Sequence, residues 1–84
     1  MIRNKDIEEE LLRNNIKFQF SLLSRLIEVE KDNSNIYFIW YDADFVYTQL
    51  RSYACWYNLK KFTNISDLIQ YLLNELFENK VIYI

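Results

Sequence analysis

The clearest hydrophobic pattern lies near the C-terminus, where apolar residues recur at helical spacing. Asn64, followed three residues later by Asp67, provides a capping signal just before this pattern. The spacing predicts an amphipathic helix over 65–78 that ends at Asn79, with a wide apolar face that should cover a sheet and supply most of the core. The apolar positions are Leu68, Ile69, Leu72, Leu73, Leu76 and Phe77.

A second, narrower helical pattern lies near the N-terminus. Ile7, Leu11 and Leu12 form an apolar stripe, and Asn4 is placed to cap a helix over 4–14. The intervening glutamates should face water, as an acidic run on a helix usually does. These residues are Glu8, Glu9 and Glu10.

Between the two helical patterns, apolar and polar residues alternate, which is typical of half-buried strands. Alternation over 16–22 predicts a first strand, and a phase shift at Leu22 and Leu23 predicts a bulge or tight bend before a second strand over 25–31. A helix over 22–30 is an alternative. Polar turn residues at 31–35 and 42–44 then flank a strand over 36–41.

The stretch 45–57 admits both a strand and a helix, because several of its apolar residues also fit helical spacing. Its aromatic and β-branched content favours a single strand. Alternation then places Tyr47, Arg51 and Tyr53 on one face. The other face, which the C-terminal helix should cover, would carry Val46, Leu50, Ala54 and Trp56.

The complete pattern predicts one α+β domain over 1–84, with element order α-β-β-β-β-α-β. An N-terminal helix precedes an antiparallel meander of about four strands, a C-terminal helix packs on the sheet, and a short final strand follows over 80–84. Lys60 and Lys61 should mark a solvated exit from the last strand of the meander.

Composition limits the chemistry of the chain. It contains no histidine, no glycine and one cysteine, Cys55, among 84 residues. Without these residue types there is no imidazole base, no glycine-rich phosphate loop, no internal disulfide and no cysteine zinc site. We therefore expect no enzymatic activity, no metal and no cofactor, and we expect Cys55 to be a small buried apolar residue.

Two further features bear on location and origin. The N-terminus lacks an apolar signal region, and the longest apolar run, 36–41, is too short to cross a bilayer, so we expect a cytoplasmic protein that does not enter a membrane. Phe, Ile, Asn, Lys and Tyr make up 38 of the 84 residues, and their codons are rich in A and T. This bias indicates a very low-GC genome, and a tiny, aromatic-rich, motif-free cytoplasmic protein from such a genome is often an accessory protein of a phage or mobile element.

Aromatic residues raise the question of function. Ten of the 15 aromatic rings fall within 37–62, more than a small core can cover. We therefore predict a protein-binding module, an inhibitor or adaptor of a host protein, which also self-associates as a homodimer. The predicted contact residues are Tyr47, Arg51 and Tyr53, with Asp42 and Asp44 as a polar rim.

Three other constellations are weaker. Arg51, Lys60 and Lys61 near Tyr and Trp rings resemble a single-strand nucleic-acid surface, but the net charge of −2 and pI of about 5.0 oppose phosphate binding. Asp42 and Asp44 are too few carboxylates for a metal site, and turn chemistry explains them better. The acidic residues as a group carry too little net charge to imitate DNA.

Overall fold

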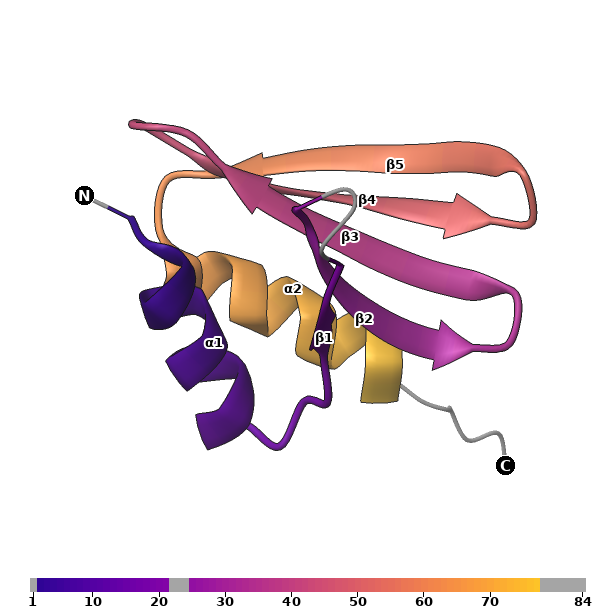
Figure 1. Ribbon diagram of the computed structural model, residues 1–84, viewed down its shortest axis with the longest axis horizontal. Coiled ribbons are helices and arrows are strands. Elements are labelled where there is room, and N and C mark those ends of the chain that lie inside the picture. Colours follow the sequence, from indigo (N-terminus) through magenta and orange to yellow (C-terminus); the bar gives the residue numbers. More distant parts are fainter. Residues whose placement is uncertain (1, 22–24, 78–84) are drawn as a thin grey trace, which may run out of the picture.

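The computed structural model describes residues 2–21 and 25–77 and shows an antiparallel sheet with the C-terminal helix packed on one face and the N-terminal helix packed beside that helix (Figure 1). Sheet order follows chain order from β1 to β5. This arrangement confirms the predicted α+β fold, with an N-terminal helix, a meander and a C-terminal helix. The elements are α1 (Asn4–Arg13), β1 (Gln19–Phe20), β2 (Ile27–Asp32), β3 (Asn35–Tyr41), β4 (Val46–Ser52), β5 (Cys55–Phe62) and α2 (Ile65–Phe77).

The core lies between the sheet and α2, with α1 packed beside α2. Strand alternation sends every second side chain toward the helices, and those of β2, β3 and β4 that point inward are buried there. The helices contribute most of their predicted apolar residues, but Leu12 of α1 and Phe77 of α2 are exposed, which the spacing did not predict. The cluster comprises Ile7, Leu11, Ile16, Ile27, Val29, Tyr37, Ile39, Val46, Leu68, Ile69 and Leu72.

Helix α1 begins one residue earlier than a cap at Asn4 would place it. Arg3, not Asn4, is the N-cap: its backbone is extended, and its carbonyl accepts the N–H groups of Asp6 and Ile7. The Arg3 guanidinium also donates to the Asp6 carboxylate, which lowers the pKa of that carboxyl group. The Asp6 carboxylate, held by Arg3, stabilises the positive N-terminal end of the helix, so the helix forms without a side-chain cap from Asn4.

The first predicted strand is much shorter than 16–22, because only Gln19 and Phe20 pair with β2. Ile16 instead belongs to the end of α1, where its N–H donates to the Leu11 carbonyl after Asn15 takes a positive φ of 59°. The Ser21 N–H donates to the Leu26 carbonyl, and the bulge or tight bend predicted at Leu22 and Leu23 lies outside the described residues. The alternative helix over 22–30 is wrong for 27–30, which belong to β2.

The single strand predicted over 45–57 is two strands, β4 and β5, joined by a two-residue loop at Tyr53 and Ala54. The loop escaped prediction because neither residue is a usual turn former, and Tyr53 itself adopts a positive φ of 58°. The alternative helix over this stretch is also wrong. Lys60 and Lys61, expected beyond the last strand, lie within β5.

The predicted start of the C-terminal helix is confirmed. The Asn64 Oδ1 atom accepts the Asp67 N–H at 2.8 Å, which caps α2. The buried Leu68, Ile69 and Leu72 then face the sheet. The predicted helix end at 78–79 and the final strand over 80–84 lie outside the described residues.

Candidate functional site: the aromatic face of the sheet

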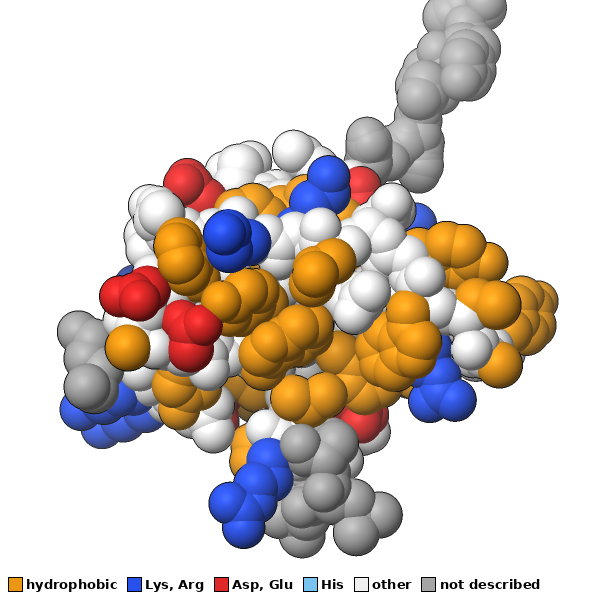
Figure 2. All heavy atoms as spheres, turned by 90° about the horizontal axis from the view of Figure 1, so that it is seen from above, with side chains coloured by type: hydrophobic (Ala, Val, Ile, Leu, Met, Phe, Trp, Pro, Cys, Tyr) orange, Lys and Arg blue, Asp and Glu red, His pale blue; other side chains and the backbone are white. Residues whose placement is uncertain are grey.

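The side of the sheet away from α2 carries a group of aromatic and basic side chains. The strand register places Trp40 opposite Tyr47 and Arg51 opposite Trp56. Figure 2, seen from above and so from the β5 side of Figure 1, shows hydrophobic side chains across the middle of the molecule, with basic ones beside them. We call the face of the sheet away from α2 the aromatic face and define it by Phe38, Trp40, Phe45, Tyr47, Gln49, Arg51, Trp56 and Lys61.

A stacked ring pair occupies one end of the aromatic face. Trp40 and Tyr47 lie on adjacent strands with ring centroids 5.5 Å apart and planes 10° apart. The Tyr47 hydroxyl donates to Asp42 at 2.5 Å, which raises the pKa of Tyr47 and lowers that of Asp42. The hydrogen bond fixes the Tyr47 ring, so this end of the face is rigid before any partner arrives.

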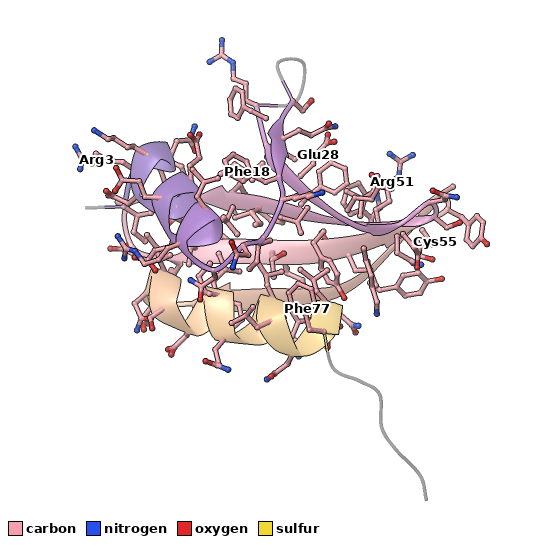
Figure 3. The ribbon with its side chains drawn as sticks, turned by 90° about the horizontal axis from the view of Figure 1, so that it is seen from below. Arg3, Phe18, Glu28, Arg51, Cys55 and Phe77 are labelled. Carbon is pink, nitrogen blue, oxygen red and sulfur yellow. The ribbon has the colours of Figure 1, made fainter. Side chains whose placement is uncertain are left out.

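A second aromatic group occupies the other end. Phe38 and Trp56 have centroids 5.1 Å apart, and the Arg51 guanidinium lies 5.8 Å from the Trp56 ring. Phe38 is only 7% exposed beneath this group, whereas Trp56 is 49% exposed. Figure 3 shows Arg51 on the side of the sheet away from α2.

A shallow depression of about 530 Å³ separates the two groups. It is lined by Leu26, Trp40, Gln49 and Trp56. An apolar hollow with aromatic walls and one amide at its lining is the usual form of a socket for a protruding apolar side chain.

The basic side chains are divided between the two sides of the sheet. Lys61 lies on the aromatic face, with its Nζ atom 4.4 Å from the Phe45 ring centroid. Lys60 points to the helix side, 5.9 Å from the Tyr71 ring of α2. Of the three cations predicted to lie near the rings, Arg51 and Lys61 therefore lie on the aromatic face and Lys60 does not.

The five predicted site residues are not all neighbours. Asp42, Asp44 and Tyr47 lie together at one end of β4, and Arg51 lies four residues farther along the same face. Tyr53 lies at the opposite hairpin, about 20 Å of strand from Tyr47, and is 79% exposed. The turn role of Asp42 is confirmed, because its Oδ1 atom accepts the N–H groups of Asp44 and Phe45.

Sequence reasoning missed part of the face. Trp56 was expected under α2, but the loop at Tyr53 and Ala54 reverses the chain and places Trp56 beside Arg51. Cys55 was expected to be buried, and for the same reason it lies exposed next to this loop (Figure 3). A strand of 13 residues is more than twice the usual length, and that excess was a signal for a turn within it.

The described residues offer little other site chemistry. Within 2–21 and 25–77, no group of three or more acidic or cysteine side chains is placed to hold a metal ion. The helices of the same described ranges include none that is long and apolar enough to cross a membrane. Comparison with models of protein families, with curated proteins and with solved structures finds no match for this chain.

Proposed function

We propose that this protein is a small non-enzymatic binding module that docks on a host protein through the aromatic face. We further propose that it serves a phage or mobile element as a cytoplasmic inhibitor or adaptor. The composition bias toward residues with A/T-rich codons supports such an origin. The aromatic face supports the proposal that the protein is a binding module.

The observation that carries this proposal is the pairing of partly or fully exposed Trp, Tyr and Arg side chains in fixed positions. Trp40 stacks on Tyr47, and Arg51 lies over Trp56. These three residue types dominate the energetics of protein interfaces, especially when they surround a hollow that excludes water. Their contacts with one another reduce the side-chain entropy that a partner must otherwise remove.

The sharpest test compares two double variants in capture from the native host, followed by calorimetry with the purified partner. Tyr47→Ala with Arg51→Ala should weaken binding by at least about thirtyfold and leave the unfolding midpoint within a few degrees. Gln70→Ala with Asn74→Ala, on the exposed side of α2, is the matched control and should bind like the wild type. Unchanged binding by the first variant would place the interface elsewhere, with acidic α1 as the next candidate.

A nucleic-acid function is the second candidate, because Arg51 and Lys61 share the aromatic face with stacking rings. Lys60, the third cation of that prediction, points to the other side of the sheet. Titration of labelled single-stranded DNA and RNA at several salt concentrations distinguishes this function from protein binding. Binding through phosphate contacts would weaken steeply as the salt concentration rises.

Self-association is a further part of the proposal. The aromatic face can pack against the same face of a second copy, which fits the homodimer predicted from the surplus of rings. Light scattering at high micromolar concentration tests it. A mass near that of the 10.4 kDa monomer would count against the dimer.

A further inference from the structure

Strand β5 has one side without a strand beside it. Among the described residues, β5 is the last strand of the sheet and pairs only with β4. Seven of its eight residues are exposed, and Lys60 and Phe62 contact the Tyr71 ring of α2. A long edge of this kind presents backbone N–H and C=O groups to any extended chain that approaches it.

The charges of the chain are segregated around this edge. The stretch 46–62, which forms β4, β5 and their loop, contains Arg51, Lys60 and Lys61 and no acidic residue. Among the described residues, the acidic side chains lie on the helices, on β2 and at the Asp42–Asp44 turn, with Asp42 near Lys61. The net charge of −2 therefore conceals a locally basic edge.

The side chains of β5 are also divided along its length. Trp56, Tyr57 and Leu59 make the first part apolar and exposed, and Lys60 and Lys61 make the second part basic. The two lysines point to opposite faces, over Tyr71 and Phe45 respectively. A strand paired at this edge would meet positive charge on both of its faces at one end and apolar surface at the other.

This layout discriminates among possible occupants. A second copy of β5 would bring its own lysines to a basic edge, and lysine on an edge strand opposes such pairing. A nucleic acid would match the charge but has no peptide backbone to continue the sheet. An acidic peptide segment matches both the charge and the backbone groups.

We propose that the β5 edge binds an extended segment of the partner protein that is acidic in its N-terminal part and apolar beyond it. The segment adds antiparallel to β5, as every other strand pair of this sheet does. Its acidic residues then lie opposite Lys60 and Lys61, and its apolar residues lie opposite Trp56 and Tyr57. This inference rests on the proposed function, because it specifies how the protein partner docks.

The test uses an eight-residue peptide with two N-terminal glutamates followed by alternating valine and threonine. Nuclear magnetic resonance titration and amide hydrogen exchange of the full chain should show shifts and slowed exchange concentrated in 55–62. The same peptide with lysines in place of the glutamates, and an oligothymidylate of eight nucleotides, are the comparison probes. Stronger binding by the oligothymidylate at the same residues would overturn the proposal in favour of nucleic acid.

Charge reversal provides the decisive variant. Lys60→Glu with Lys61→Glu should lower the affinity for the glutamate peptide by about tenfold or more and raise the affinity for the lysine peptide. Lys5→Glu with Lys31→Glu changes net charge equally at exposed sites away from β5 and should leave the glutamate peptide bound as in the wild type. An equal loss of affinity for the glutamate peptide in both variants would show that net charge alone causes the effect, and it would overturn the edge site.

The free protein supplies a further check. Slow exchange throughout β5 at a dimeric mass would assign the edge to a second copy, and slow exchange at a monomeric mass would assign it to the rest of this chain. Both results would overturn the proposal. Capture of a host partner without any peptide binding would overturn only the edge site, whereas failure to capture a partner would overturn the protein-binding function itself.

Discussion

The two faces of the sheet share the same strands but differ in what lies over them. On the helix face, Ile27, Tyr37 and Ile39 are each 1% exposed beneath α2 and α1. On the aromatic face, Trp40 of β3 and Tyr47 of β4 remain partly exposed. Both faces are rich in apolar atoms, so coverage and not hydrophobicity separates them.

This difference separates folding from binding. Full burial of one aliphatic side chain contributes about 1.5–3 kcal/mol, so the helix face provides most of the stability. The aromatic face loses less water on folding and keeps its surface for a partner. Substitutions on the two faces should therefore have opposite profiles: loss of stability on one and loss of binding on the other.

The largest effect is expected at Leu72, which is fully buried in the middle of α2. Leu72→Asp places an unpaired charge in the core, which costs several kcal/mol, comparable with the roughly 5–10 kcal/mol stability of a small domain. We expect an unfolded chain by circular dichroism. Leu12→Asp is the matched control, because Leu12 is a helix leucine that is 64% exposed, and it should melt cooperatively. A wild-type melt for Leu72→Asp would show that α2 is not the core element.

The next effect compares two consecutive residues on opposite faces of β4. Val46 is fully buried, so Val46→Ala should lower the free energy of unfolding by about 2 kcal/mol. Tyr47→Ala, one position along, should leave the unfolding midpoint within a few degrees. Urea denaturation of both variants measures the contrast. A larger loss for Tyr47→Ala would mean that the aromatic face also carries the fold.

A smaller effect concerns the buried Tyr37, whose hydroxyl donates to Glu75 of α2 at 2.6 Å. Tyr37→Phe removes this hydrogen bond to a carboxylate and should cost about 1–2 kcal/mol at neutral pH. Tyr53→Phe, which loses an exposed hydroxyl, is the control and should be neutral. Chemical denaturation at pH 7 measures both, and equal stability of the two variants would show that the bond contributes nothing.

The same bond has a defined pH dependence. Burial and the hydrogen bond to Glu75 raise the pKa of Tyr37, with Asp32 adding negative charge nearby. The folded state therefore favours the protonated hydroxyl, so its stabilisation is complete below the unfolded pKa of about 10 and is lost as pH rises above it. Wild type should lose stability more steeply than Tyr37→Phe between about pH 9 and 11. Parallel curves would contradict this linkage.

Local signals explain which parts of the fold were predictable. The α2 cap and the turn at Asp42 were predicted because a nearby side chain bonds the backbone there, and such bonds can be read from a few residues. The β4–β5 loop was not predicted because Tyr53 has no turn chemistry of its own. Its positive φ is imposed by the pairing of the two strands, which is a tertiary constraint.

The candidate site shows the same limit. Tyr47 and Arg51 were placed together on the face away from the helix because alternation holds within β4. Trp56 lies beyond the loop, where the sequence no longer determines the phase. The contribution of Trp40 depends on the register between β3 and β4, which no pattern within either strand specifies.

The smallest effect is expected at Tyr53, where stability and binding should separate within one residue. A bulky side chain at positive φ is strained, and this first position of a two-residue loop normally favours glycine. Tyr53→Gly relieves the strain but frees the unfolded chain, so we expect a net gain of roughly 0.5–1 kcal/mol in urea denaturation. Tyr53→Phe keeps the strain and should show no gain in stability.

Tyr53 is the most exposed ring of the predicted contact set. Tyr53→Gly should therefore also weaken the binding of the captured partner, whereas Tyr53→Phe should retain most of the affinity. A variant that becomes more stable and binds as the wild type does would remove Tyr53 from the interface and leave its strained conformation without a binding role.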